Sequence, residues 1–193
     1  MLHFHVIDQR WEVAASDLVS CKKVSPKVPL GVKRYLVVHR LGPEIVDEHD
    51  ARLIARPITG LDVARLFAHH DGLPRPNLSK YSGGRMAYGA VLSPLTGALY
   101  QCLPFNAKMA SNAPHNTDSF SLAVLHDMSK SALTAFGLHC LIESIKYLMR
   151  EYQLLGVHME LVGHDDVGRK LKGCPGEHLD MNALRSALDG MRL

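Results

Sequence analysis

Apolar residues in this chain gather into short runs separated by polar and proline-containing stretches, a pattern typical of short strands alternating with helices. Residues 35–38 read Tyr-Leu-Val-Val, which predicts a buried central strand ending at His39. Residues 87–92 and 98–103 predict two further strands, and the five residues between them, Ser-Pro-Leu-Thr-Gly, predict a hairpin turn. Two more apolar runs predict strands over residues 120–125 and 157–162.

Three other stretches carry apolar residues at the spacing of an amphipathic helix. We expect a helix over residues 60–72, a long helix over residues 131–153 capped by Ser131, and a C-terminal helix opened by Asp180. Residues 1–30 contain breaks at prolines and are expected to be irregular. Strands mixed with helices, one strand pair being a hairpin, predict an α/β (α+β) fold with a central mixed β-sheet covered by helices.

Composition narrows the class of protein. The chain has 193 residues, 47% of them apolar and 21% charged, which fits a globular protein with one domain. The net charge is +3 and the basic residues are scattered, so we expect no nucleic-acid binding. The first residues lack a secretory signal and no run approaches the ~18 apolar residues of a membrane helix. The sequence therefore predicts synthesis in the cytoplasm without membrane insertion.

Three residues among the twelve histidines and four cysteines have a spacing that suggests a metal site. His39 and His164 each follow a predicted strand, and Cys174 comes ten positions after His164 in a turn between Gly173 and Pro175. Imidazole nitrogen and thiolate sulfur are the ligands zinc prefers, and three protein ligands leave a fourth position for water, as hydrolysis requires. From spacing alone, structural histidines and a buried thiol remain the alternative.

Four signatures in order resemble one known family. They are YLVVHR, MAYGAVLSPLTGALYQCLPFNAKMA, NTDSFSLAVL and GHDDVGRKLKGCPG, and together they cover about residues 35–188. The sequence resembles the zinc-dependent N-acetylmuramoyl-L-alanine amidases (amidase type 2), which include amidase-type phage lysozymes and peptidoglycan-recognition proteins. The resemblance implies a peptidoglycan-recognition-protein-like fold, with residues 31–193 as the catalytic domain and residues 1–30 as an N-terminal extension of unknown role.

The resemblance also implies roles for individual residues. His39, His164 and Cys174 fall on the positions that bind Zn²⁺, and Tyr88 and Lys172 fall on the catalytic pair. In such a pair a lysine ammonium can stabilise charge developing on the scissile carbonyl oxygen, and a tyrosine hydroxyl can orient water or relay a proton.

Two positions depart from the family pattern. Where members commonly have Tyr-His at the start of the hairpin strand, this chain has Tyr88-Gly89. Where many have Trp-His-Ala, this chain has Asn112 in place of the histidine. An asparagine can hydrogen-bond a sugar or peptide but cannot act as a base at neutral pH. We therefore expect Asn112 and Asn116 to bind substrate, and the departures to alter the substrate groove.

Three function classes follow. The first is a monomeric peptidoglycan hydrolase that cleaves the amide between N-acetylmuramic acid and L-alanine, of the phage endolysin type. The second is a peptidoglycan-binding module of the same fold without catalysis. The third is a regulatory protein that binds a host enzyme, for which the sequence offers no argument. Members that only bind lack the metal cysteine, and Cys174 is present, which favours the enzyme.

Overall fold

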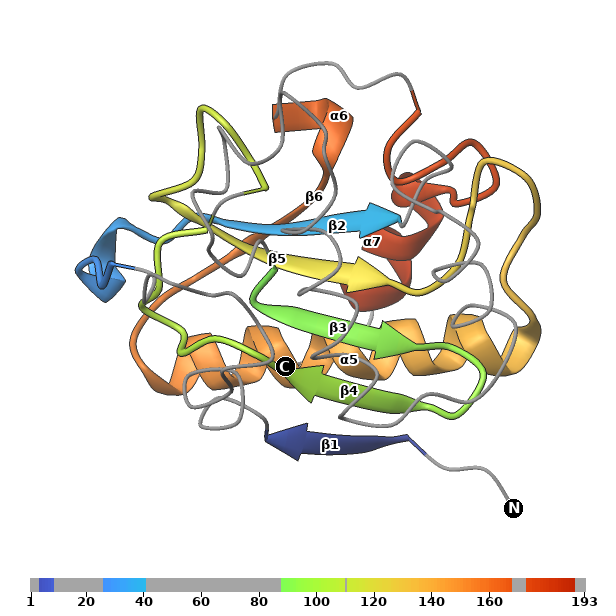
Figure 1. Ribbon diagram of the computed structural model, residues 1–193, viewed down its shortest axis with the longest axis horizontal. Coiled ribbons are helices and arrows are strands. Elements are labelled where there is room, and N and C mark those ends of the chain that lie inside the picture. The colour runs from blue at the N-terminus through green and yellow to red at the C-terminus, as the bar shows by residue number, and fades with distance from the viewer. Residues whose placement is uncertain (1–3, 9–25, 41–87, 110, 168–172, 190–193) are drawn as a thin grey trace, which may run out of the picture.

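The centre of the molecule is a six-stranded mixed sheet (Figure 1). The computed structural model describes residues 4–8, 26–40, 88–109, 111–167 and 173–189. Within these residues the strands lie in the order β1-β4-β3-β5-β2-β6. Their bounds are β1 His5–Asp8, β2 Tyr35–Arg40, β3 Ala90–Ser93, β4 Ala98–Gln101, β5 Ser119–Val124 and β6 Glu160–Gly163.

Parallel pairing dominates the half of the sheet that carries the candidate site. Strand β2 lies between β5 and β6 and is parallel to both. Strand β3 is parallel to β5 and forms the predicted hairpin with antiparallel β4. Strand β2 is buried as its apolar sequence predicts, since Leu36, Val37 and Val38 have no exposed surface. The predicted mixed sheet is therefore confirmed.

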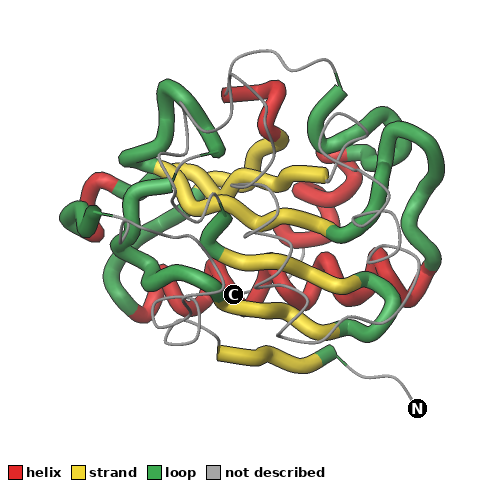
Figure 2. The backbone as a smooth tube through the Cα atoms, viewed as in Figure 1, coloured by secondary structure: helices red, strands yellow, loops and turns green. Residues whose placement is uncertain are grey.

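Two helices cover one face of this sheet. Helices α5 (Ala135–Leu154) and α7 (Met181–Asp189) both lie behind the sheet in Figure 1, and the tube in Figure 2 shows the same layering. The side chains of Leu141, Ile145 and Leu148 on α5 are fully buried against the sheet core. Shorter turns are η1 (Leu30–Val32) and α6 (His164–Val167). None of the described helices is long and apolar enough to cross a bilayer.

The starts of the two long helices test the predicted caps. The cap of α7 is confirmed, because Asp180 Oδ1 accepts hydrogen bonds from the backbone N–H groups of residues 182 and 183 at 2.9 and 3.0 Å. The cap of α5 is wrong by three residues. Thr134, not Ser131, accepts from the N–H of Gly137 at 3.0 Å, while the Ser131 hydroxyl pairs with His126 instead.

Two short elements were not expected from the sequence. The prediction of irregular structure at the N-terminus is wrong for residues 5–8, which form the edge strand β1 parallel to β4. The turn α6 lies within a stretch expected to be loop. Four-residue elements are too short to show a hydrophobic period, and β1 is held by backbone pairing with a distant strand. The helix predicted over residues 60–72 lies outside the described residues.

Candidate metal centre

The register of the sheet brings the two predicted metal histidines together. Strands β2 and β6 are parallel neighbours in which Val38 pairs with Gly163. The next residue on each strand is His39 and His164, so both side chains leave the same edge of the sheet. Their ring centroids lie 4.5 Å apart. Strand pairing therefore brings the two histidines together, although they are far apart in the sequence.

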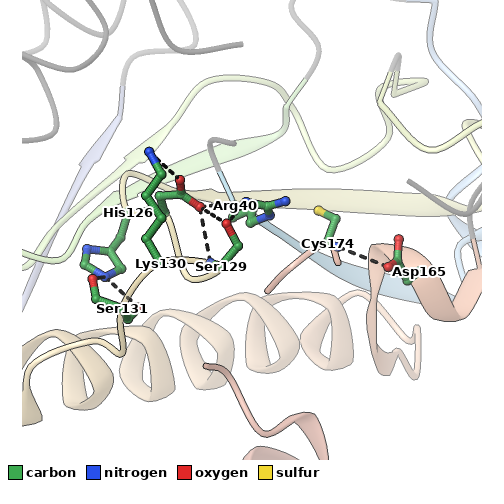
Figure 3. Close-up of polar contacts among 8 residues, drawn as sticks. Arg40, His126, Ser129, Lys130, Ser131, Asp165 and Cys174 are labelled. Atoms are coloured by element: carbon green, nitrogen blue, oxygen red, sulfur yellow. Dashed lines mark hydrogen bonds and ion pairs between the residues drawn. The ribbon is translucent and has the colours of Figure 1, made fainter. Parts of the chain in front are cut away.

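Asp165 holds the third residue, Cys174, by hydrogen bonds to its backbone (Figure 3). Its Oδ2 accepts hydrogen bonds from the backbone N–H groups of Gly173 at 2.7 Å and of Cys174 at 3.1 Å. Its own N–H donates to the Cys174 carbonyl oxygen at 2.9 Å. These three bonds link α6 to the segment that carries the cysteine. Asp165 was not singled out from the sequence, although it directly follows His164.

A partly buried ion pair lies next to this region. Arg40, the last residue of β2, donates to Asp127 at 2.6 Å and also bonds Ser129 (Figure 3). Burial alone would raise the pKa of Asp127, but the bonds from Ser129 and Arg40 hold it below its ordinary value. The backbone of Met128 in turn lies against Gly176. The ion pair thus holds in place the loop on which the cysteine segment packs.

The ligand atoms of His39, His164 and Cys174 all lie within 4.8 Å of one another. The Cys174 sulfur is 3.9 Å from His39 Nδ1, close to the ~3.6 Å that tetrahedral zinc with ordinary bond lengths requires. All three side chains are buried, with exposed fractions of 2%, 4% and 9%. Among the described residues this is the one group of histidine, cysteine or acidic side chains that could hold a metal ion.

The two imidazoles of this group are in the protonation state that binds a metal ion. Burial lowers the pKa of His39 well below its ordinary value, the nearby His164 lowers it further, and a hydrogen bond to the Asn112 side chain raises it in part. Burial also lowers the pKa of His164, partly offset by the negative charge of Asp165. Both imidazoles are therefore neutral at neutral pH and offer lone pairs. His164 Nδ1 is buried without a hydrogen-bond partner, as expected for a nitrogen that faces a metal ion.

Tyr88 lies beside this group, and Lys172 cannot be placed. The Tyr88 ring centroid is 5.3 Å from that of His39, and the side chain is buried. Burial raises the pKa of Tyr88 above its ordinary value, and the charge of Cys174 raises it further, so the phenol keeps its proton. Lys172 falls outside the described residues. Of the predicted catalytic pair, the described residues therefore include Tyr88 alone.

Of the two predicted substrate-binding asparagines, Asn112 contacts a predicted metal ligand and Asn116 contacts Asn112. Asn112 has no exposed surface, and its Oδ1 is 2.5 Å from His39 Nε2. Asn116 accepts a hydrogen bond from the Asn112 backbone N–H through its own side-chain oxygen at 2.7 Å. A contact between Asn112 and substrate therefore receives no support from its position, because its side chain is closed off and already paired.

The missing histidine at position 89 also has a structural account. A Cβ placed on Gly89 would lie 2.3 Å from the ring of Phe120, which is fully buried in β5. Here Phe120 occupies the space next to the hairpin strand that a larger residue at position 89 would need. The departure from the family pattern is therefore part of the core packing.

The fold is shared with several solved structures. It is similar to N-acetylmuramoyl-L-alanine amidase LysC from Clostridium intestinale, with a TM-score of 0.61, 16% identity, and coverage of 97% of this chain and 99% of that one. The Ph2119 endolysin of a Thermus scotoductus bacteriophage gives 0.62, 18%, 94% and 97%. Drosophila PGRP-LB gives 0.62, 16%, 92% and 91%.

These similarities concern the fold. The structures on which they rest are amidase endolysins and peptidoglycan-recognition proteins, the two groups that the sequence resembles, so the expected fold class is confirmed. No protein-family model and no curated protein matches the sequence. The function of the chain is therefore inferred from its own side chains.

Proposed function

We propose that this chain is a zinc-dependent N-acetylmuramoyl-L-alanine amidase of peptidoglycan, of the phage endolysin type. The observation that carries the proposal is the buried group of two imidazoles and one thiol at the ends of β2 and β6. The same fold in amidase endolysins supports this reading. We propose zinc as the resident metal, held by His39, His164 and Cys174, because neutral imidazoles with a thiolate match its preferences.

The chain's own residues divide the remaining work. A zinc ion, when bound, supplies Lewis acidity toward the scissile carbonyl and lowers the pKa of a water. Asp165 keeps the Cys174 sulfur on the same side as the two imidazoles through its bonds to the backbone. The burial of the three ligands excludes bulk water from behind the site, which strengthens electrostatic interactions there.

We assign Tyr88 and Lys172 to the reacting amide. Tyr88 keeps its phenolic proton because burial raises its pKa, so its hydroxyl can donate a hydrogen bond to the substrate or orient a water. The ammonium of Lys172, two residues before Cys174 in sequence, would stabilise negative charge on the carbonyl oxygen. Tyr88 would then place a proton, and Lys172 would stabilise the negative charge that develops.

The test is digestion of purified peptidoglycan followed by mass spectrometry of the muropeptides, with and without a chelator. We expect free stem peptides beginning with L-alanine, about one zinc per chain, and loss of both on Cys174→Ser or His39→Ala. His139→Ala, at an exposed histidine on α5, is the matched control and should cut normally. A folded, zinc-loaded protein that releases no stem peptide would overturn the proposal.

A second candidate is a recognition protein that binds wall fragments without cutting them. It is favoured by similarity to a human peptidoglycan-recognition protein solved with glycosamyl muramyl pentapeptide, at 18% identity and a TM-score of 0.59. The presence of Cys174 within the buried metal group argues for the enzyme. Sedimentation with peptidoglycan without any cleavage, by protein containing zinc, would favour the recognition protein instead.

A further inference from the structure

Asn112 contacts a metal ligand on the side away from the metal. His39 turns Nδ1 toward the Cys174 sulfur, 3.9 Å away, and Nε2 toward Asn112 Oδ1, 2.5 Å away. A neutral imidazole carries one hydrogen, on either of its two nitrogens. An amide oxygen only accepts hydrogen bonds, so this contact requires the hydrogen to be on Nε2, and Nδ1 is then left with its lone pair.

The orientation of the Asn112 amide is itself fixed by its other neighbours. Its Nδ2 donates to Ser119 Oγ at 2.6 Å and to Ser121 Oγ at 2.8 Å. The Ser119 hydroxyl donates its one hydrogen to the His115 carbonyl oxygen at 2.5 Å, so that hydroxyl can only accept from Asn112. The amide nitrogen must therefore face the serines, and the amide oxygen must face His39.

Further hydrogen bonds keep this amide in place. The N–H of Asn112 donates to Asn116 Oδ1 at 2.7 Å, and Ser121 Oγ also pairs with Ser111 Oγ at 2.6 Å. Both serines that receive the amide belong to β5, which is the strand paired with β2. The residue that bonds His39 is thus anchored to the strand next to the one that carries His39, and its burial is complete.

We propose that Asn112 is a positioning residue of the metal centre, which selects the Nε2–H form of His39 and presents its Nδ1 to zinc. This inference rests on the proposed function for the identity of the metal. It replaces the substrate-binding role expected from the sequence. Partners behind metal-bound histidines fix ring orientation and tautomer, and losing one costs about 10- to 100-fold in metal affinity.

The first test determines, in the unaltered protein, which ring nitrogen of His39 carries the hydrogen. Nitrogen-15 NMR distinguishes an imidazole protonated on Nε2 from one protonated on Nδ1. In metal-free protein at pH 8 we expect the Nε2–H form of His39, assigned by its loss in His39→Ala. A predominant Nδ1–H form would overturn the inference. Because this measurement needs neither zinc nor peptidoglycan, its outcome is independent of whether the chain is an amidase.

The second test measures zinc affinity by competition with a chromophoric chelator. Asn112→Leu, which removes the acceptor, should bind zinc about 10- to 100-fold more weakly. Asn112→Asp keeps an acceptor toward His39 Nε2, although it loses the two bonds that Nδ2 donates to the serines, and it should bind zinc more tightly than Asn112→Leu. Ser131→Ala, at a serine whose hydroxyl pairs with His126 and takes no part in this network, is the matched control and should leave the affinity unchanged.

The outcomes separate this inference from the proposed function. If Asn112→Leu binds zinc as tightly as the unaltered protein, the positioning role is wrong even when the chain proves to be an amidase. If the unaltered protein binds zinc but cuts no peptidoglycan, the function is wrong and the positioning role still stands. Should Asn112→Leu fail to fold, the NMR measurement on the unaltered protein decides the inference.

Discussion

Asp165 is the residue through which the backbone around Cys174 is held, because a single carboxylate oxygen accepts from two consecutive N–H groups. Hydrogen bonds to a charged acceptor are stronger than neutral ones. A change here alters where the sulfur lies without removing any metal ligand. The effect of Asp165 should therefore appear in metal binding before it appears in folding.

We expect Asp165→Ala to weaken zinc binding by about 10- to 100-fold, because the cysteine segment loses both bonds from its N–H groups. Chelator competition measures the affinity. Glu143→Gln is the control, because Glu143 lies on α5, where it pairs with Lys146, and its change should not alter zinc binding. Equal affinities for Asp165→Ala and the unaltered protein would show that the segment is held by other contacts.

A double-mutant cycle can test whether a side chain at position 89 destabilises the fold through its contact with Phe120. Gly89→Ala places a Cβ against the Phe120 ring and should destabilise the fold by about 1–3 kcal/mol. Phe120→Leu replaces the obstructing ring with a smaller side chain. In that background Gly89→Ala should lower the free energy of unfolding by clearly less. Urea denaturation of the four proteins in this cycle gives the coupling. Additive effects would mean that the ring does not cause the strain.

At the scale of elements, the segment after Cys174 is constrained by its glycine. Gly176 has φ of +123°, a conformation that side chains disfavour, and a Cβ there would lie 2.4 Å from the Met128 backbone. Backbone cannot move aside as a flexible side chain can. This close approach is what seats the cysteine segment on the loop held by Arg40 and Asp127.

Gly176→Ala should therefore lower the free energy of unfolding by more than about 2 kcal/mol and weaken zinc binding as well. Thermal denaturation and chelator competition measure the two effects. Gly31→Ala is the matched control, since nothing lies within 4 Å of a Cβ there, and it should change stability by less than about 0.5 kcal/mol. A tolerated Gly176→Ala would contradict the close packing.

Another element-level feature is a buried lysine that joins three segments. Lys33, directly after η1, donates to the carbonyl oxygens of Ala107 and Ser119, each at 2.7 Å. Burial lowers the pKa of Lys33 from 10.5 to about 8, partly offset by Asp118. Between these two values the unfolded chain binds more protons than the folded one, so the folded state gains stability as pH rises.

We expect the stability of the unaltered protein relative to Lys33→Met to be constant below about pH 8 and to increase from there toward pH 10. The slope is at most about 1.4 kcal/mol per pH unit. Urea denaturation at pH 7, 8, 9 and 10 measures it. A pH-independent difference would mean that Lys33 keeps an ordinary pKa in the folded protein.

For the molecule as a whole, the sequence predicted those features that have a local signal. The apolar run of β2, the β3–β4 hairpin and the cap of α7 are each written in adjacent residues. The edge strand β1 and the turn α6 were missed, because each has four residues and no period. Their existence depends on pairing and packing with distant residues.

The residues of the candidate metal centre also fall into those with a local sequence signal and those without one. His39 and His164 were predictable because each ends an apolar run, and parallel strands place such ends together. The position of Asn112 was not, since whether an asparagine faces substrate or a neighbouring histidine depends on contacts 73 residues apart. Residue type gave its hydrogen-bonding capacity correctly, and only the tertiary structure gives its partner.

A metal held by His39, His164 and Cys174 would join β2, α6 and the cysteine segment, so zinc should stabilise the whole fold. At free zinc about 100 times the dissociation constant the gain is about 2.7 kcal/mol. Differential scanning fluorimetry with zinc and with chelator measures the change in Tm. Cys174→Ser should show a much smaller shift, and an equal shift in both proteins would place the metal elsewhere.

The separation of the ligands along the chain has a consequence for biosynthesis. His39 and Cys174 meet in the folded protein although 135 positions separate them. On the ribosome His39 is made long before Cys174, so a growing chain can offer zinc at most a partial set of these ligands. A metal ion that needs all three ligands would therefore bind only after translation of the cysteine segment, and the proposed metal centre would be incomplete until that point.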